Sequence, residues 1–527
     1  MGLGAADVIQ VAQAETPHPR PWARHAMAAV GSGLLLAASL PSLDVAPLAW
    51  FGLVPLLLVI REGGVRAAFF TGWLSGTTFF VAVTYWVVHT IRHYTALPGP
   101  LAVVLLLLMS LVLGLYMAAF AAGVRWMQAR RLPWVYLAPA LWVVLEWLRG
   151  WFVVGFPWGA LGYSQWRFTD LVQVVEVTGV YGLSALLVFF NTVLAAIATA
   201  RGRLERRHVA ALSVLTVLMI ALPALGRRRV ATLARLPAAG RLVVGVAQGN
   251  IAQDHKWDPA FVDETMARYE QLTRAAVSEG AELVVWPETA TPFFFQQAGA
   301  RRESVLRLAR ELDTFIVFGS PAATFDGPRV VGQRNRAYLV SPQRGEVDFY
   351  DKMQLVPFGE YVPFARVLFF VQRMVEAVGT LVPGTRATVF EGPQGRFGVL
   401  VCYEGIFPWI SRRFVRDGAE FLVNITNDAW YGRTAAPYQH LAQATLRTIE
   451  NRVPLVRAAN TGISAIIDED GRIAWAGQLE QLVGHTEQIS WHHVRTFYTR
   501  FGDVFVGMCA LAVVVAGLAG HRRRPAP

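Results

Sequence analysis

The sequence predicts a helical membrane domain with an α/β domain inserted before its last span. Hydrophobic residues make up 54% of the 527-residue chain, and its mean hydropathy of +0.39 is too high for an ordinary soluble protein. Long apolar runs fill residues 26–225 and return at 503–520, whereas residues 241–500 have mixed polarity. In that stretch, short β-rich runs alternate with helical patterns, which indicates an α/β sheet domain.

A membrane span needs about 20 apolar residues, and about eight runs approach or exceed this length. We predict spans at residues 26–43, 45–60, 67–91, 98–124, 134–154, 179–200, 209–225 and 503–520. The first two runs are short, and a turn at Pro41-Ser42-Leu43-Asp44 separates them. A re-entrant pair is therefore an alternative to two full spans.

Short loops rich in arginine and lysine stay in the cytoplasm. The arginines of the short loops therefore predict how these spans are oriented. If eight spans alternate, one side holds the arginines at 20, 24, 61, 66, 125, 130, 131, 201, 203, 206, 207, 522, 523 and 524. The short loops of the other side hold Arg92, Arg149 and Arg167. Both chain ends are therefore predicted to be cytoplasmic, with the α/β domain on the opposite side.

These patterns divide the chain into consecutive segments. We expect a cytoplasmic segment at 1–25, a membrane domain of seven helices at 26–225, a linker at 226–240, the α/β domain at 241–500, a final transmembrane helix at 503–520 and a cytoplasmic tail at 521–527.

The net charge of +11 points to membrane headgroups rather than to nucleic acid. The arginines of the chain cluster beside apolar runs. At such positions arginines attract anionic lipids and set the orientation of membrane spans. No nucleic-acid partner is expected. The chain has two cysteines, Cys402 in the α/β domain and Cys509 inside the last apolar run, so no disulfide is expected. Neither a metal nor a cofactor is expected.

The α/β domain is expected to carry its site at the carboxyl ends of strands, as open α/β sheets do. We predict strands at 242–247, 282–286, 314–318, 337–340, 398–401, 421–425 and 454–458, and helices at 260–279, 301–312, 406–417 and 436–452. Three reactive side chains follow such runs: Glu288 after residues 283–286, Lys352 after 347–350, and Cys402 after 399–401.

This trio matches the requirements of covalent catalysis. A thiol needs a base or an electropositive setting to act as a nucleophile near neutral pH. Glu288 can take the thiol proton, and Lys352 can stabilise the anion of a tetrahedral intermediate. Taken singly, each residue has a simpler interpretation, because a cysteine after an apolar strand is usually a buried small hydrophobe and a lone Glu or Lys is usually solvated.

The surrounding residues resemble the nitrilase superfamily. The matching pieces are Trp286-Pro287-Glu288, Lys352 with the run PFGEYVP at 357–363, and Cys402-Tyr403-Glu404. Together with the preceding spans, that run is similar to bacterial apolipoprotein N-acyltransferases. Further matches are QGNI at 248–251 with Lys256-Trp257, NITNDAWYG at 424–432 and NTG at 460–462.

The resemblance implies a nitrilase-like αββα sandwich on the periplasmic face of the bacterial inner membrane. It implies transfer of an acyl chain from a phospholipid to the N-terminal amine of a diacylglyceryl-cysteine on an apolipoprotein, with the bilayer as the third partner. It also implies roles for nine residues: the triad Glu288, Lys352 and Cys402, the supporting residues Glu360, Tyr403 and Glu404, and the substrate-binding residues Trp257, Trp430 and Asn427.

The implied mechanism is ping-pong through a Cys402 thioester, which must be kept from water. Residues 353–390 include an apolar run at Phe364 and 367–371 that forms either a membrane-dipping lid or a packing helix. The aromatic run at 293–295 lines an acyl pocket or the core. Within the membrane part, Glu146 and Arg149 form a polar site or, as we favour, an interfacial ion pair.

Two other functions remain open from the residues alone. A membrane-tethered nitrilase-like amidase would use the same triad to pass the acyl group to water. A transporter or assembly scaffold would use the α/β domain only for binding and would need no reactive thiol.

Overall fold

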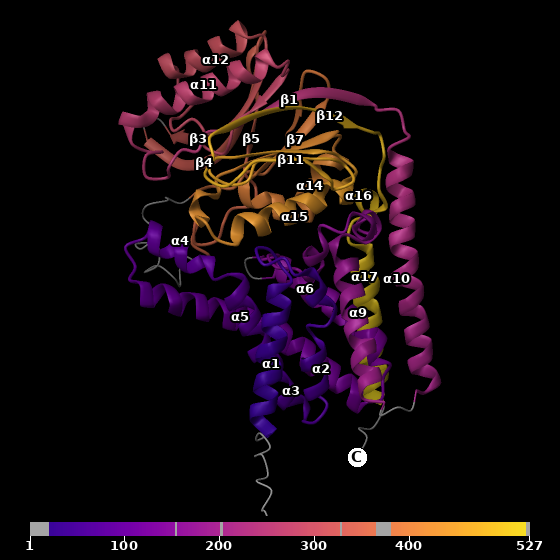
Figure 1. Ribbon diagram of the computed structural model, residues 1–527. Helices are drawn as coiled ribbons and strands as arrows, with labels where there is room; N and C mark the ends of the chain where they lie inside the picture. Colours follow the sequence, from indigo (N-terminus) through magenta and orange to yellow (C-terminus); the bar gives the residue numbers. More distant parts are fainter. Residues whose placement is uncertain (1–20, 153–154, 201–203, 327–328, 365–380, 523–527) are drawn as a thin grey trace, which may run out of the picture.

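The computed structural model describes residues 21–152, 155–200, 204–326, 329–364 and 381–522. A helical part lies at the bottom of Figure 1 and a part built on two β-sheets lies above it. The long helix α10 (Arg206–Leu233) runs beside α9 (Val180–Ala198) and α17 (Val504–Arg522) and leads up to the sheets.

The helical part contains, in chain order, α1 (Pro21–Ala38), η1 (Ala46–Trp50), α2 (Val54–Val59), α3 (Val65–Val83), α4 (Trp86–Tyr94), α5 (Gly99–Ala129), α6 (Trp134–Trp151), η2 (Leu161–Gln165), α7 (Thr169–Val172), α8 (Val175–Thr178), α9 and α10. Four helices in the described residues, α5, α9, α10 and α17, are long and apolar enough to cross a membrane. A fifth span results if α3 and α4, which meet at a bend of 53°, are counted as one. The count of eight spans therefore remains a prediction.

Two span boundaries differ from the sequence-based ones. The run predicted as 26–43 ends as a helix at Ala38, and the next run is a short apolar segment at Ala46–Val59. Helix α10 continues past the predicted end at 225 to Leu233, into the predicted linker. Its arginines find carboxylates there: Arg227 donates to Asp170 at 3.0 Å and Arg229 to Glu176 at 3.0 Å. The last turns of α10 thus lie against α7 and α8, to which these ion pairs connect them.

The upper part is a four-layer αββα sandwich. One six-stranded sheet has the order β12-β1-β2-β3-β4-β5 and the other the order β11-β10-β9-β8-β7-β6. Helices α11 (Val262–Ser278) and α12 (Ala300–Glu311) cover the first sheet, and α14 (Pro408–Arg416) and α15 (Ala436–Asn451) lie between the second sheet and the helical part (Figure 1). This is the layering that the resemblance implied.

The strands are β1 (Gly240–Gln248), β2 (Leu283–Val285), β3 (Phe315–Asp326), β4 (Arg329–Ser341), β5 (Gly345–Asp351), β6 (Val389–Glu391), β7 (Arg396–Val401), β8 (Phe421–Thr426), β9 (Leu455–Ala459), β10 (Ala465–Ile467), β11 (Ile473–Ala476) and β12 (Val483–Trp491). Short helices η3 (Pro259–Phe261), η4 (Cys402–Ile406), η5 (Asp428–Tyr431) and α16 (Phe497–Phe501) complete the described elements.

Polar contacts join the two parts through α15. The Trp158 indole donates to Gln439 at 2.6 Å, and the Gln439 amide donates to the Pro41 carbonyl at 2.8 Å. The Val180 amide, at the start of α9, donates to Glu450 at 3.0 Å. Because α15 is almost entirely buried, these bonds hold the sandwich directly on the helical part.

Glu146 and Arg149 do not form the ion pair that the sequence favoured, and each binds the segment after α6 separately. Glu146 accepts from the Leu161 amide at 2.8 Å, and Arg149 donates to the Trp158 carbonyl at 2.8 Å. Both side chains are buried. They satisfy backbone groups of the segment between α6 and η2, which supports a structural role for both.

Candidate active site

The three reactive residues lie just past strand ends, as the sequence predicts. Glu288 follows β2, Lys352 directly follows β5, and Cys402 directly follows β7. The first two come from one sheet and Cys402 comes from the other. All three are buried, with 5%, 1% and 5% of their surface exposed, respectively. The site therefore lies where the ends of the two sheets face each other.

Lys352 lies between two carboxylates. Its Nζ is 2.8 Å from Glu360 Oε1 and 3.7 Å from Glu288 Oε1. Burial alone would lower the pKa of Lys352, but the negative charges of Glu360 and Glu288 outweigh burial and raise the pKa above its ordinary value. Lys352 is therefore a permanent cation beside the thiol.

Hydrogen bonds also fix Glu288. The Asn335 amide donates to Glu288 Oε1 at 2.6 Å and to Glu360 Oε1 at 3.2 Å. The backbone amide of Asn427 donates to Glu288 Oε2 at 2.9 Å. Each oxygen of the carboxylate thus has a donor, and the group is aimed rather than free to rotate.

Cys402 has a left-handed backbone conformation, with φ of 52°, which a residue with a side chain rarely adopts outside tight turns and functional sites. Burial raises the pKa of its thiol, the charge of Glu288 raises the pKa further, and Lys352 opposes both effects. The resting group is therefore a thiol. It requires a base at the moment of attack, which is the role the sequence predicts for Glu288.

Two of the residues predicted to support the triad, Tyr403 and Glu404, lie in buried positions beside it. Glu404 accepts from the Tyr350 hydroxyl and the Met353 amide at 2.7 Å each, and from the Val401 amide at 2.8 Å. Burial raises the pKa of Glu404 to about 7. Its bonds tie the end of β7 to the segment after Lys352. Tyr403 is buried, and its ring lies edge-on to Phe407 at 5.0 Å.

The predicted substrate-binding residues divide into two groups. Asn427 lies in the site, where its side chain donates to Gln253 at 2.7 Å and accepts from Asn460 at 3.1 Å. Trp430 is partly buried and packs on Tyr94 of α4 with ring centres 4.6 Å apart. Trp257, in contrast, is 54% exposed. The structure brings Asn427 to the triad and leaves Trp257 at the surface.

Comparison with known proteins decides the family. Residues 32–193 match the family model described as the apolipoprotein N-acyltransferase N-terminal domain, and residues 243–487 match the one described as carbon-nitrogen hydrolase. A curated apolipoprotein N-acyltransferase of Geobacter metallireducens is 43% identical, over 95% of this chain and 96% of the relative. The chain belongs to the apolipoprotein N-acyltransferase family. The resemblance inferred from the motifs is thereby confirmed.

A second curated relative carries the same name. An apolipoprotein N-acyltransferase of Chlorobaculum tepidum is 32% identical, over 94% of this chain and 96% of the relative. Among solved structures, Saccharomyces cerevisiae Nit3 of the nitrilase superfamily is 18% identical with a TM-score of 0.38, and the match covers 48% of this chain and 91% of Nit3.

This family member has a second buried lysine at the site. Lys256 Nζ donates to the backbone carbonyl of Glu288 at 2.9 Å. Burial lowers the pKa of Lys256 to about 8. The sequence placed Lys256 in a matching motif without assigning it a role, and Asn335 was not predicted at all. Asn335 lies inside the long strand β4, where nothing in the pattern distinguishes it.

A buried polar network holds the Cys402 backbone. His440 Nε2 is 3.1 Å from the Cys402 carbonyl oxygen, and His440 Nδ1 is 3.1 Å from Arg457 Nη2. Burial lowers the pKa of His440 and the charge of Arg457 adds to this effect, whereas the Asp428 carboxylate opposes both. Because the carbonyl can only accept, His440 Nε2 carries a proton and donates to it. His440 Nδ1 also lies 3.0 Å from Asp428 Oδ1, so the ring is held by both Asp428 and Arg457.

Asp428 completes the network. It accepts from Arg457 at 2.8 Å and from the Thr426 hydroxyl at 2.9 Å. Although burial opposes it, the charge of Arg457 lowers the pKa of Asp428 to about 2. Asp428 thus stays ionised at any pH at which the protein is used. Nothing in the spacing of His440 or Arg457 predicted this arrangement.

We expect His440→Ala to slow acylation of Cys402 by about 10-fold to 100-fold, because small misplacements of a reacting group cost rates of this order. His440→Gln, which keeps a side-chain donor, is expected to recover part of the loss. Single-turnover acylation of the purified protein measures the effect. A change in KM alone, or equal losses in both variants, would contradict a positioning role through the Cys402 carbonyl.

Helix α4 contacts the site from the helical part. The Tyr94 hydroxyl donates to the Ala429 carbonyl at 2.7 Å, and the Thr90 hydroxyl donates to the Trp430 carbonyl at 2.9 Å. Both carbonyls belong to η5, which begins one residue after Asn427 and its bond to Glu288. Helix α4 therefore supports the loop whose Asn427 amide binds Glu288.

The two aromatic runs noted in the sequence, at 293–295 and 364–371, differ in how far the structure places them. Phe295 is fully buried and packs on Phe318 at 4.8 Å, so it belongs to the core of the first sheet. Phe364 is 62% exposed. Residues 367–371 of the predicted lid lie outside the described residues, so the choice between a lid and a packing helix stays open.

Proposed function

We propose that this chain transfers an acyl chain from a phospholipid to the N-terminal amine of the diacylglyceryl-cysteine of an apolipoprotein, through a thioester on Cys402. The observation that carries the proposal is the meeting of a buried thiol, a fixed carboxylate and a paired ammonium at the sheet ends of a chain in the apolipoprotein N-acyltransferase family. The face of the sandwich beside this site rests on the helical part through α4 and α15, which favours a lipid donor.

The first half-reaction forms the thioester. Glu288 takes the proton of the Cys402 thiol as the sulfur attacks the ester carbonyl of the phospholipid. The ammonium of Lys352 has three donors; one binds Glu360, and another is available to the developing oxyanion. The tetrahedral intermediate collapses, the glycerol oxygen leaves with the proton from Glu288, and a lysophospholipid departs.

The second half-reaction transfers the acyl group. The acceptor amine attacks the thioester carbonyl, Glu288 takes a proton from the amine, and the Cys402 sulfur leaves and is reprotonated. Water would divert the thioester to a free fatty acid. The burial of all three residues limits that loss.

Intact mass measurement tests this proposal. Incubation of the purified protein with phosphatidylethanolamine is expected to add the mass of one acyl chain to Cys402, and a diacylglyceryl-cysteine peptide is expected to remove it as an N-acylated product. Release of free fatty acid at the same rate with and without the peptide would favour the amidase. Failure of any acyl adduct to form would refute the thioester.

We also propose that the protein is a multi-pass protein of the bacterial inner membrane with eight spans and a periplasmic sandwich. A reporter active only outside the cytoplasm is expected to work when inserted between β3 and β4 and to fail when fused after Pro527. The arginine asymmetry of the short loops motivates this expectation. Activity of the terminal fusion alone would refute the eight-span topology.

A further inference from the structure

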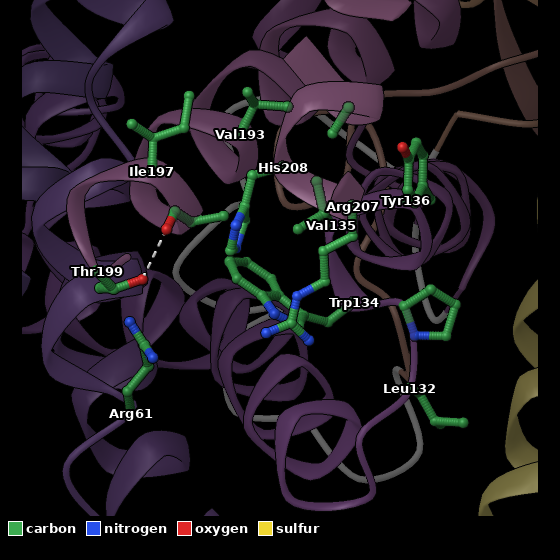
Figure 2. Close-up of a pocket in the computed structure, with 13 residues that line it drawn as sticks. Arg61, Leu132, Trp134, Val135, Tyr136, Val193, Ile197, Thr199, Arg207 and His208 are labelled. Carbon is green, nitrogen blue, oxygen red and sulfur yellow. Dashed lines mark hydrogen bonds between the residues drawn. The ribbon is translucent and has the colours of Figure 1, made fainter. Parts of the chain in front are cut away.

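A cavity of about 130 Å³ lies among the helices, away from the triad. It lies where α6 and α10 begin, where α9 ends, and beside Arg61 after α2 (Figure 2). Helix α10 starts at this cavity and ends next to β1, so its length separates the cavity from the sandwich. The cavity is roughly ten times the size that one water needs. It has room for a small headgroup.

Basic side chains gather on its wall. Arg61, Arg207 and His208 line it, and no Asp or Glu is among its lining residues in the described part of the chain. Arg207 also pairs with Glu205 at 2.9 Å, but both side chains are mostly exposed, with 73% and 60% of their surface accessible. Such a pair is weak and easily exchanged for another anion. The Glu205 amide donates to His208 Nδ1 at 3.1 Å, so Nδ1 is the acceptor and Nε2 of the ring can donate.

The rest of the wall is apolar or aromatic. Val193 and Ile197 of α9 and Trp134 of α6 line the cavity beside the cations. On α10, Val209 and Leu212 are 50% and 40% exposed next to it. Cations joined to an apolar, outward-facing helix surface match a lipid with a charged head and acyl tails. A free anion would use only the cations.

We infer that this cavity binds the headgroup phosphate of an anionic phospholipid, with the acyl chains along α9 and α10. The ligand is distinct from the proposed acyl donor, because the cavity lies at the far end of α10 from the sandwich. An anionic lipid fits better than phosphatidylethanolamine, because the ammonium of the latter would face Arg61 and Arg207. The cavity also lies on the arginine-rich side of the predicted topology, where anionic lipids attract such residues.

Native mass spectrometry and thermal unfolding of the full chain in neutral detergent test the site. Phosphatidylglycerol is expected to remain bound as a stoichiometric adduct and to raise Tm, whereas phosphatidylethanolamine at the same concentration is expected to do so at least about 10-fold less well. Loss of the charge-assisted hydrogen bonds in Arg61→Gln/Arg207→Gln is expected to weaken phosphatidylglycerol binding by about 10-fold or more. The matched control is Arg228→Gln, an exposed arginine further along α10, which is expected to bind like the wild type.

Cooperative thermal unfolding without added lipid, and the Cys402 acyl adduct where it forms in the wild type, report folding of the variants. If the double variant fails this test, Arg207→Gln alone is measured, since Arg207 is largely exposed. Equal binding of both lipids, wild-type binding by the arginine variants, or an equal loss in Arg228→Gln would overturn the inference. Equal protection by inorganic phosphate alone would identify an ion site and overturn the lipid assignment. Because the readout is binding, absence of acyl transfer would refute the proposed function without touching this site.

Discussion

Cys402→Ser is expected to lower acyl transfer by about 10⁴-fold or more and to leave no acyl adduct that survives to intact mass measurement. Loss of a catalytic nucleophile has effects of this size or larger in other enzymes. The buried setting strengthens the expectation. Burial and the charge of Glu288 raise the pKa even of the thiol, and a serine hydroxyl in the same place is far harder to ionise.

The chain provides its own matched control for this experiment. Cys509 lies in α17, in the helical part, and is the other free cysteine of the described residues. Cys509→Ser is expected to keep the adduct and the transfer rate. Protein level in the membrane and Tm of both variants show whether the serine is tolerated. Wild-type transfer by Cys402→Ser would remove Cys402 from the mechanism.

The sequence located the candidate triad because strand ends are predictable. Glu288, Lys352 and Cys402 each follow a run that forms a strand. The strands before Glu288 and Lys352 belong to one sheet and the strand before Cys402 to the other, so the packing of the two sheets brings the three residues together. Their hydrogen-bond partners were harder to find. Asn335 reaches Glu288 and Glu360 from the middle of β4, and His440 reaches the Cys402 carbonyl from α15. Those contacts depend on how two sheets and a helix pack, which local pattern does not encode.

The strands of the fold were likewise predicted only in part. The strands of the core, such as β7 and β8, were predicted because their sequences are mostly apolar, and both strands are buried except for Arg396. With the run at 347–350 counted as β5, four of the described strands were missed: β6, β10, β11 and β12. β6 and β10 have three residues each, and β12 carries Thr486, Glu487 and Gln488, which give no apolar alternation. β12 forms because β1, far away in the sequence, offers its edge along the full length of the strand. Pairing with β1 therefore determines that this segment is a strand, although its local β-propensity does not.

The last prediction separates the roles of Glu288 and Lys352. Glu288→Gln removes the base and also a charge that raises the pKa of the Cys402 thiol. Burial, the larger cause, remains, so the pKa of the thiol stays above its ordinary value. Its alkylation by a small electrophile is therefore expected to be slow at neutral pH and to rise about tenfold per pH unit, since it depends on the free thiolate. Acyl-enzyme formation is expected to fall by roughly 100-fold to 10,000-fold.

Lys352→Met is expected to act mainly on the acyl-enzyme. Removing an oxyanion donor costs about 100-fold to 1,000-fold in rate. The substitution also removes the charge that lowers the pKa of the Cys402 thiol, so alkylation is expected to decline but not to vanish while Glu288 is present. Lys352→Arg keeps the charge and is the matched control.

Two pH profiles on each variant, one for alkylation and one for acyl-enzyme formation, make the comparison. Total rate loss does not distinguish the roles, because the two ranges overlap. The slope does: only Glu288→Gln is expected to turn alkylation into a steep function of pH, and only Lys352→Met is expected to lower acylation much more than alkylation. If Glu288→Gln alkylates like the wild type at every pH while Lys352→Met does not alkylate at all, then Lys352 is the group that activates the thiol and Glu288 is not its base.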